Sequence, residues 1–450
     1  MNTLLGCIAD DVAGATELAS VLARSGMWVR LHLGVPEQVE SPVAQDGADD
    51  DHSAPFEIIA LNPRSACTSV VVKEAVQAWQ WLSRQGVRRV YWKYQLTSDG
   101  QACEHIGPVA DALLDAIAEV RGLDTNLMSV HCTTATQSGD PLSSSQSLTD
   151  RQCKDHQYKH HQCRDDQREH VSKLISVLSA QTRRRVDNMP CSILACEQEQ
   201  IRDRLGELAA GGVSHIVGNA VSSADLVSLV RATERFPLIC GSSAQALHLP
   251  ALFRIRGFLS SADEQAPRPS PKGAVLALID DSSEVARRQV QAWPAHLPSM
   301  RLDPAQLTTH DERTAAVAAF VVVLAEAQAK NCALLVHADR RNAEPPRADQ
   351  ADARIESVLA DCALEAFGHD VRRFIAAGEQ TVAAVSGALG IHCLEVGHEI
   401  AHGAPWCRAQ VSVPNASGTA EIAIALKLDS SGEEHFFSEA LERIEPPVRD

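Results

Sequence analysis

Two aspartates near the start of the chain are the first residues that could carry chemistry. Asp10 and Asp11 follow the apolar run Leu4–Ala9, which predicts a buried strand, and precede the helical pattern Ala15–Arg24. A carboxylate at the end of a strand can orient a hydroxyl group or take its proton during phosphoryl transfer. Asp is also common at the start of a helix, so one of the two could instead cap this helix. The pattern alone leaves both interpretations open.

Polar residues at or after the ends of two later predicted strands could complete a binding site. They are Arg64, Lys93, Thr97 and Asp99. Arg offers two parallel donors to a carboxylate and Lys offers a point charge, so together they would form a cationic pocket for an acid. The alternative for each residue is an ordinary surface ion pair, which is worth about 0–1 kcal/mol.

These residues belong to an alternation of predicted strands and helices, which is typical of a mostly parallel sheet with helices on both faces. Ligands of such folds bind beyond the carboxyl ends of the strands. The segment Gly257–Gly273 is rich in Pro, Ser and charged residues and predicts a linker. The sequence therefore predicts an α/β protein of two domains, residues 1–255 and 273–450, with mostly parallel sheets and a site in the cleft between them. Among the predicted strands are Trp28–Val35, Phe56–Leu61, Val90–Tyr94, Ile193–Cys196, Arg373–Ala377 and Cys393–Val396.

The composition argues against several classes of partner. The chain has 450 residues, of which 45% are hydrophobic, and a formal net charge of -17. An acidic protein repels nucleic acids and anionic membranes, so we expect neither as a partner. The first residues lack the basic start of a signal peptide, and no apolar run approaches the ~20 residues of a membrane helix. The 13 cysteines are then expected to be reduced thiols, and the protein to be cytoplasmic.

Several strings, in order along the chain, resemble one family. IADDVAGATELA resembles the IADDFTGATDLA opening of the four-carbon acid sugar kinases. VYWKYQLTSDGQACEHIGPVADALLDAI, SAQTRRRV, PLICGSSAQALHLP and VRRFIAAGEQTVAAVSGALGI continue the resemblance. Ordered strings over most of a chain are more specific than any single motif. The resemblance implies a sugar-acid-binding N-terminal domain, a nucleotide-binding C-terminal domain, and transfer of the ATP γ-phosphate, with Mg²⁺, to a hydroxyl of a four-carbon acid such as a 3-oxo-tetronate.

The resemblance also assigns roles to residues that match the family strings. On the acid side it implies that Asp11 and Asp99 act on the substrate hydroxyl. Binding of the acid would fall to Asp10, Arg64, Lys93 and Thr97. On the ATP side the matching residues are Ser283, Gly378, Glu379, Gln380, Thr381 and Gly432.

The chain departs from the family where glycines would cradle phosphates. The family string AGGETSGAV is AGEQTVAAV here, so Glu379 stands for a glycine, and Ser242 and Ala244 replace two glycines of an earlier turn. A side chain at a position of positive φ would be strained, and a glutamate repels a triphosphate. Asp280 and Asp281 add further negative charge. A second hypothesis is therefore a degenerate family member that binds a sugar acid or a partner without ATP turnover.

Residues 133–170 form a polar segment without the family's pattern, and we expect a long loop there. Its cysteines and histidines (Cys153, His156, His160 and Cys163) could suggest zinc, but their spacing matches no common zinc module, so a solvated loop is the favoured interpretation. A dinucleotide oxidoreductase is disfavoured because no G-x-G-x-x-G follows a strand. A small-molecule sugar acid is the expected partner, and a homo-oligomer is compatible with the sequence.

Overall fold

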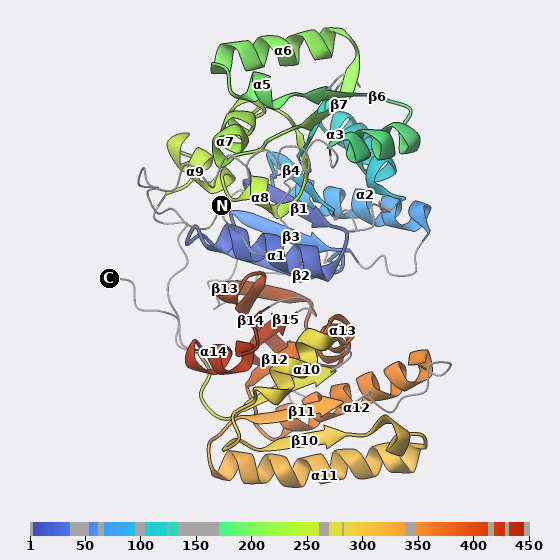
Figure 1. Cartoon of the computed structure of the whole chain (residues 1–450), viewed down its shortest axis with the longest axis vertical. Helices are drawn as coiled ribbons and strands as arrows, with labels where there is room; N and C mark the ends of the chain where they lie inside the picture. Colours follow the sequence, from blue (N-terminus) through green and yellow to red (C-terminus); the bar gives the residue numbers. More distant parts are fainter. Residues whose placement is uncertain are drawn as a thin grey trace, which may run out of the picture. The chain divides into compact units, whose positions relative to one another are not determined.

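The computed structural model has an α/β architecture (Figure 1). It describes residues 3–36, 54–61, 67–94, 104–123, 127–132, 171–260, 270–280, 283–338, 348–412, 418–427 and 432–444. Contacts divide the chain into two compact units, one of Met1–Ser25 with Gly34–Asp263, the other of Gly26–Leu33 with Glu264–Asp450. The division at Asp263 lies inside the predicted linker.

The first unit is built on a parallel sheet. Its strands follow the order β3, β1, β4, β8, β5, β7 and β6, and each neighbouring pair is parallel. β1, β3 and β4 are buried along their whole length, which explains why each appears in the sequence as a short apolar run. The strand bounds are Leu5–Ala9 (β1), Phe56–Ala60 (β3), Arg89–Lys93 (β4), Ser129–Cys132 (β5), Arg185–Met189 (β6), Val213–Gly218 (β7) and Leu238–Gly241 (β8).

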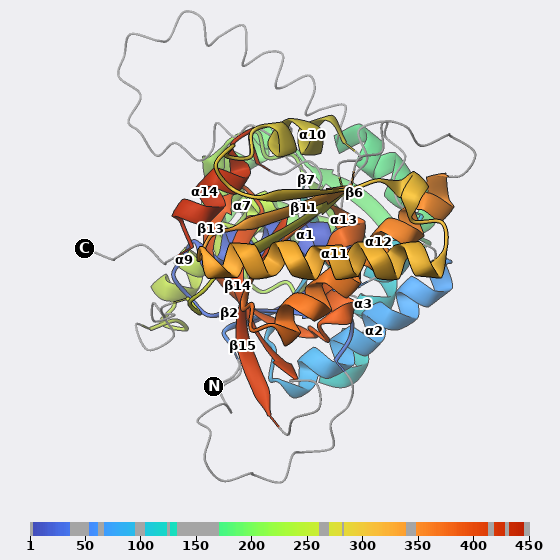
Figure 2. The ribbon, with the colours of Figure 1, turned by 90° about the horizontal axis from the view of Figure 1, so that it is seen from below.

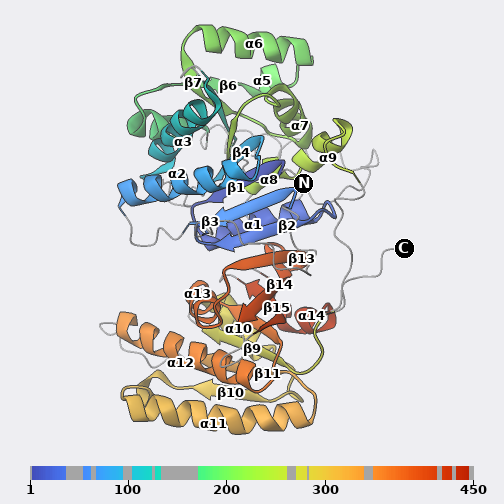
Figure 3. The ribbon, with the colours of Figure 1, turned by 180° about the vertical axis from the view of Figure 1, so that it is seen from behind.

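Helices cover both faces of this sheet. On one face α2, α3 and the helical residues 171–181 share an apolar cluster with β1 and β4 (Figure 3). On the other face α1 packs against β3 and α8. The helices are α1 (Val12–Ala23), α2 (Thr68–Arg84), α3 (Ile106–Arg121), α5 (Cys191–Leu194), α6 (Gln198–Ala210), α7 (Ser223–Ala232), α8 (Ser243–Ala246) and α9 (Leu249–Ile255).

The second unit contains a mixed sheet. β10, β11, β9, β12 and β15 are parallel neighbours, and β14 and β13 continue the sheet in antiparallel fashion. β2 (Val29–Leu33) comes from early in the chain, yet it pairs antiparallel with β13 and belongs to this unit. The other strands are β9 (Val275–Asp280), β10 (Ser299–Leu302), β11 (Leu334–Ala338), β12 (Arg373–Ala377), β13 (Cys393–Ala401), β14 (Ala404–Ser412) and β15 (Thr419–Lys427).

The second sheet also has helices on both faces. α10 and α14 join an apolar cluster with β9 and β12, whereas α12 and α13 pack together and contact β9. Figure 2 shows α11 running alongside α12. The bounds are α10 (Glu284–Gln291), α11 (His310–Ala329), α12 (Ala348–Gly368), α13 (Glu379–Ala388) and α14 (Phe436–Glu442), with a short 3₁₀ helix at Pro304–Gln306.

The predicted α/β class is confirmed, with one local error. Residues 193–196 were expected to form a strand, but Cys191–Leu194 is the short helix α5, and the strand there is β6. β6 is a polar edge strand whose residues are largely exposed or half-buried, so it carries no apolar run for the sequence to reveal. Among the described residues, no helix is long and apolar enough to cross a membrane.

Candidate functional site

The carboxyl ends of β1 and β4 bring three of the predicted residues together. Asp10 and Asp11 follow β1, Lys93 ends β4, and the Asp10 N–H donates to the Lys93 carbonyl over 3.0 Å. Asp10 and Lys93 are both buried, with 3% and 2% of their surface exposed. Adjacent parallel strands end at the same edge, so this juxtaposition follows from the sheet order.

Asp11 is the N-cap of α1. Its backbone is extended, and its Oδ1 accepts from the Gly14 N–H at 2.5 Å. Asp11 therefore caps the helix, which was one of the two interpretations that the sequence left open. The capping hydrogen bond occupies one of its two carboxylate oxygens.

Lys93 has a partner that the sequence reasoning missed. Its Nζ lies 3.4 Å from Oε2 of Glu17, which projects from α1. A Cβ on Gly14 would lie 3.4 Å from Cε of Lys93 and 3.2 Å from Oδ1 of Asp11. The absence of a side chain at Gly14 therefore allows the Lys93 side chain to pack closely against the start of α1. The acidic residue of the family string, GATDLA, stands at the position of Glu17 and was the available signal.

Three further predicted residues, Arg64, Thr97 and Asp99, lie outside the described residues. The same edge of the first unit continues at β8. Gly241 there has φ +133°, and a Cβ on it would lie 2.1 Å from the Cys132 carbonyl oxygen. Ser242, which replaces a family glycine, has the ordinary φ of −77°, and its carbonyl accepts from the Tyr91 hydroxyl at 2.5 Å.

The carboxyl ends of β9, β12 and β15 gather the residues predicted on the ATP side. The sheet register sets Ala377 beside both Ile279 and Lys427, so the turns that follow these strands are neighbours. Asp280 ends β9 and is buried, while Asp281 lies outside the described residues. Ser283 caps α10, its hydroxyl accepting from the Ala286 N–H at 3.0 Å.

Gly378 links β12 directly to α13. Its φ of +99° is one that L side chains rarely adopt, and its N–H donates to the Lys427 carbonyl over 2.9 Å. Glu379 and Gln380 follow in the first turn of α13. The first N–H groups of a helix lack an acceptor within the helix and carry partial positive charge, so this turn is suited to an anion.

The strain expected at Glu379 is absent. Among the described residues other than glycine, only Asn331 and Asp370 have positive φ. Glu379 sits in helical conformation, where a side chain costs nothing in backbone strain. The expectation was wrong because the conformational demand of the turn falls on Gly378, which the chain retains.

Thr381 and Gly432 are held by contacts within the second unit. The Thr381 side chain is fully buried, and its hydroxyl donates to Oε1 of Glu356 over 3.3 Å. Gly432 has φ +77°, and a Cβ there would lie 2.6 Å from the Phe436 ring. Its carbonyl accepts from Nε2 of Gln289 at 3.1 Å.

Lys427 is a fully buried cation at this edge. It ends β15, and its Nζ lies 5.8 Å from the centroid of the Phe436 ring. A buried lysine is costly unless anionic or aromatic groups surround it. Together with the α13 turn, it gives the edge donors and positive charge of the kind that phosphate groups require.

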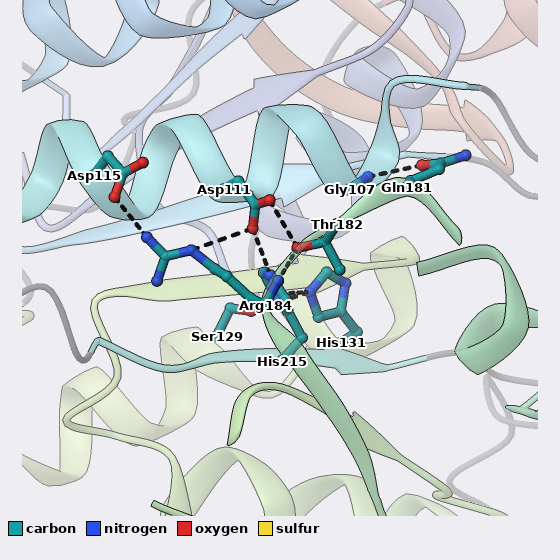
Figure 4. Close-up of polar contacts among 9 residues, drawn as sticks. All are labelled: Gly107, Asp111, Asp115, Ser129, His131, Gln181, Thr182, Arg184 and His215. Atoms are coloured by element: carbon teal, nitrogen blue, oxygen red, sulfur yellow. Dashed lines mark hydrogen bonds and ion pairs between the residues drawn. The ribbon is translucent and has the colours of Figure 1, made fainter. Parts of the chain in front are cut away.

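A chain of hydrogen bonds is buried in the first unit, and Figure 4 shows its part from His131 to Asp111. The Tyr94 hydroxyl lies 3.0 Å from Nδ1 of His131, whose Nε2 lies 3.0 Å from the Ser129 hydroxyl. Ser129 lies 2.7 Å from Nδ1 of His215, whose Nε2 is 2.8 Å from Oδ1 of Asp111. An ionised Asp111 only accepts, so His215 donates from Nε2. When the His215 ring is neutral, its Nδ1 accepts from Ser129, and each earlier donor then points the same way, from Tyr94 towards Asp111.

The chain of hydrogen bonds is a packing device. Burial, and secondarily the neighbouring His215, hold the pKa of His131 well below its usual value, which agrees with a neutral ring that accepts from Tyr94. Ser129, His215 and Asp111 have the composition of a nucleophilic triad. Ser129 is fully buried, however, so no substrate reaches its hydroxyl.

Asp111 also anchors the segment that follows residues 133–170. The Thr182 hydroxyl donates to its Oδ2 over 2.7 Å, and Arg184 lies 3.3 Å from its Oδ1 and 2.5 Å from Asp115. The string SAQTRRRV, singled out by resemblance, thus docks onto α3 in the structure. The polar segment 133–170, with its candidate zinc ligands, lies outside the described residues.

Comparison with known proteins identifies both halves of the chain. A model described as a sugar-binding N-terminal domain matches residues 5–249, and one described as a nucleotide-binding C-terminal domain matches residues 281–437. A 3-oxo-tetronate kinase of Pseudomonas fluorescens is 34% identical over 97% of this chain and 96% of its own length. Kinases of the same name from Pseudomonas savastanoi and Cupriavidus necator are 31% and 30% identical, each over 98% of this chain and 97% of its own length.

Two solved structures share the fold. A Salmonella typhimurium protein superposes with a TM-score of 0.74 at 23% identity, covering 97% of this chain and 98% of its own. A Haemophilus influenzae protein does so with a TM-score of 0.69, also at 23% identity, covering 97% and 99%. At this identity the likeness concerns the fold alone.

Proposed function

Because this chain belongs to the four-carbon acid sugar kinase family, we propose that it transfers the γ-phosphate of ATP to a hydroxyl of a four-carbon sugar acid such as a 3-oxo-tetronate. The observation that carries the proposal is the phosphate-compatible edge of the second unit. There a glycine of positive φ opens α13 beside the buried Lys427. Such transfer depends on positioning and on charge stabilisation, for which these groups are suited.

On the ATP side we assign the phosphate contacts to backbone N–H groups and to positively charged groups. Thr381 would act through its N–H, since its hydroxyl is bonded to Glu356. Gly378 and Gly432 keep the two turns open, with Ser283, Glu379 and Gln380 lining them. Mg²⁺ bound with ATP would neutralise phosphate charge, and the carboxylate of Asp280 is the kind of oxygen ligand it prefers.

On the acid side the proposal uses the residues at the ends of β1 and β4. Lys93 with Arg64 would hold the substrate carboxylate, and Asp10 and Thr97 would bind its hydroxyl groups. Asp11 or Asp99 would orient or deprotonate the hydroxyl that is phosphorylated. Since Asp11 already caps α1 through Oδ1, Asp99 is our preferred base.

The second candidate is a family member that binds a sugar acid without ATP turnover. It is favoured by Glu379, whose half-buried carboxylate occupies the first turn of α13, where the triphosphate would lie. Calorimetry with ATP and Mg²⁺ separates the two, followed by a coupled kinase assay over a panel of four-carbon acids. Micromolar to low-millimolar binding with turnover supports the kinase, and folded protein that binds an acid but not ATP supports the alternative.

A further inference from the structure

The first unit contains a cavity at the amino ends of its strands, opposite the carboxyl ends that carry Asp10 and Lys93. It has a volume of about 440 Å³, within the range of ligand pockets. Arg89 begins β4 at this edge and Lys93 ends the strand, which at the usual rise puts the two edges about 13 Å apart. The cavity is lined by Leu4, Arg88, Arg89, Glu234, Arg235, Phe236, Leu252, Phe253, Arg256 and Phe258.

The charge of this cavity opposes the charge of the chain. Four arginines and a single glutamate line it, in a protein of net charge -17. The glutamate, Glu234, is engaged by Arg256, whose Nε and Nη2 donate to the same oxygen at 3.1 and 2.5 Å. Arg88 and Arg235 are exposed at the rim and make no ion pair with any residue in the described ranges. The cavity therefore carries cationic donors beyond those its own carboxylate can satisfy.

Arg89 is the buried cation of this cavity. Only 6% of its surface is exposed, and its Nη2 donates to the Thr233 carbonyl over 2.7 Å. Its Nε has no hydrogen-bond partner among the described residues. Burial lowers the pKa of Arg89 to about 10, with Glu234 opposing the shift. A buried guanidinium with an unmatched donor is unfavourable by itself and is stabilised by an anion.

Aromatic rings form the apolar part of the wall. The centroids of Phe253 and Phe258 are 6.5 Å apart, and the Arg88 guanidinium carbon lies 4.9 Å from the Phe258 centroid. Phe258 is 45% exposed, so its ring is accessible to a ligand in the cavity. Rings and guanidinium groups on one wall match a ligand that has a flat apolar body and a negative group.

We propose that this cavity binds a small aromatic anion, with its negative group at Arg88, Arg89 and Arg235 and its ring against Phe253 and Phe258. A four-carbon sugar acid has no apolar body to fill this wall, so the site is distinct from the acid site proposed above. The proposal does not depend on kinase activity.

The test is calorimetry on the full chain with three probes. Phenyl phosphate carries both ring and charge, inorganic phosphate carries the charge alone, and benzyl alcohol carries the ring alone. We expect phenyl phosphate to bind with a Kd of about 1 mM or tighter, roughly tenfold or more below that of inorganic phosphate, with no detectable binding of benzyl alcohol. No binding of phenyl phosphate at 10 mM, or equal binding of both phosphates, would overturn the proposal.

Variants locate the binding. Arg88→Gln with Arg235→Gln, and separately Phe258→Ala, alter exposed side chains and should each weaken phenyl phosphate at least fivefold. Arg202→Gln removes one charge from an exposed site on α6 outside the cavity and should leave the affinity unchanged. Unaltered affinity in the cavity variants would mean that the probe binds elsewhere, for example at the phosphate edge of the second unit. An equal loss in Arg202→Gln would show unspecific attraction, and either result refutes the proposed site.

Discussion

Replacing Glu379 by glutamine is expected to tighten ATP binding. Glu379 occupies the first turn of α13, and its side chain is half-buried. A unit charge about 6 Å from a phosphate charge contributes about 0.7 kcal/mol of repulsion at the dielectric constant of water and about 2.8 kcal/mol at an effective value of 20. Half-burial puts Glu379 between these limits, so the Kd for ATP with Mg²⁺ should fall by about threefold to about a hundredfold.

The assay is calorimetric titration of ATP with Mg²⁺ at low and high salt. If the effect is Coulombic, the difference between wild type and Glu379→Gln should shrink as the salt concentration rises. The substitution should also cost about 0.3–1 kcal/mol of folding free energy, because an acidic group at a helix N-terminus is stabilising. Urea denaturation measures this second effect independently of ATP.

Glu326→Gln is the matched control. It removes the same charge from an exposed position on α11 in the same unit and should leave ATP affinity unchanged. Equal or weaker ATP binding by Glu379→Gln would refute the reasoning, and so would an equal gain in the control. The first result would mean that Glu379 does not face the phosphates, and the second that only the net charge of the protein matters.

Three further outcomes are expected. Gly241→Ala should destabilise the first unit by roughly 3 kcal/mol or more in urea denaturation, because its Cβ would meet the Cys132 carbonyl oxygen at 2.1 Å, whereas Gly387→Ala, in open space on α13, should change stability by less than about 1 kcal/mol. Arg64→Ala should raise KM for the sugar acid several-fold with a smaller change in kcat, and an unchanged KM contradicts its assignment. The folded-state pKa of His131 lies below its unfolded value, so its contribution to stability is complete above about pH 6.5 and is lost as the pH falls from there towards the folded-state pKa. Unfolding free energies at pH 7.5 and 5.5 should therefore diverge more in wild type than in His131→Phe.

The structure is predicted best from the sequence where a buried apolar strand leads directly into the residues of the candidate site. β4 is an apolar run that ends in a polar residue, β1 ends just before Asp10, and β12 ends just before Gly378. Both the extents of these strands and the meeting of Asp10 with Lys93 follow from a parallel sheet. The partner of Lys93 was missed because Glu17 lies on α1, and only the packing of α1 over β4 brings the two side chains together. Helical periodicity carries no information on such a contact, so the acidic residue of the family string was the one signal that pointed to Glu17.

Two other features are set by partners distant in the chain. β6 is polar because it lies at the edge of the sheet, where most of its side chains are not buried. It therefore lacks the apolar pattern that identifies inner strands. β2 was recognisable as a strand, but its partner β13 lies more than 350 residues further along, and the Leu33 N–H donates to the carbonyl of His392 over 2.9 Å. Sequence order alone would group β2 with the strands on either side of it, since neighbours in sequence usually pair.

The glycines that this chain has lost differ in kind from those it has kept. Gly241, Gly378 and Gly432 each hold a positive φ, and two of them also face atoms that a Cβ would strike. Ser242 and Glu379, which replace family glycines, have backbone conformations open to any residue. The replacements therefore introduce no backbone strain at these two positions and change what projects from the turns. If ATP binding is impaired, its cause should lie in the charge and bulk of side chains such as Glu379, and single substitutions should recover it without rebuilding the backbone. A backbone collapse of the turns would instead resist rescue, and the response to Glu379→Gln distinguishes these two kinds of loss.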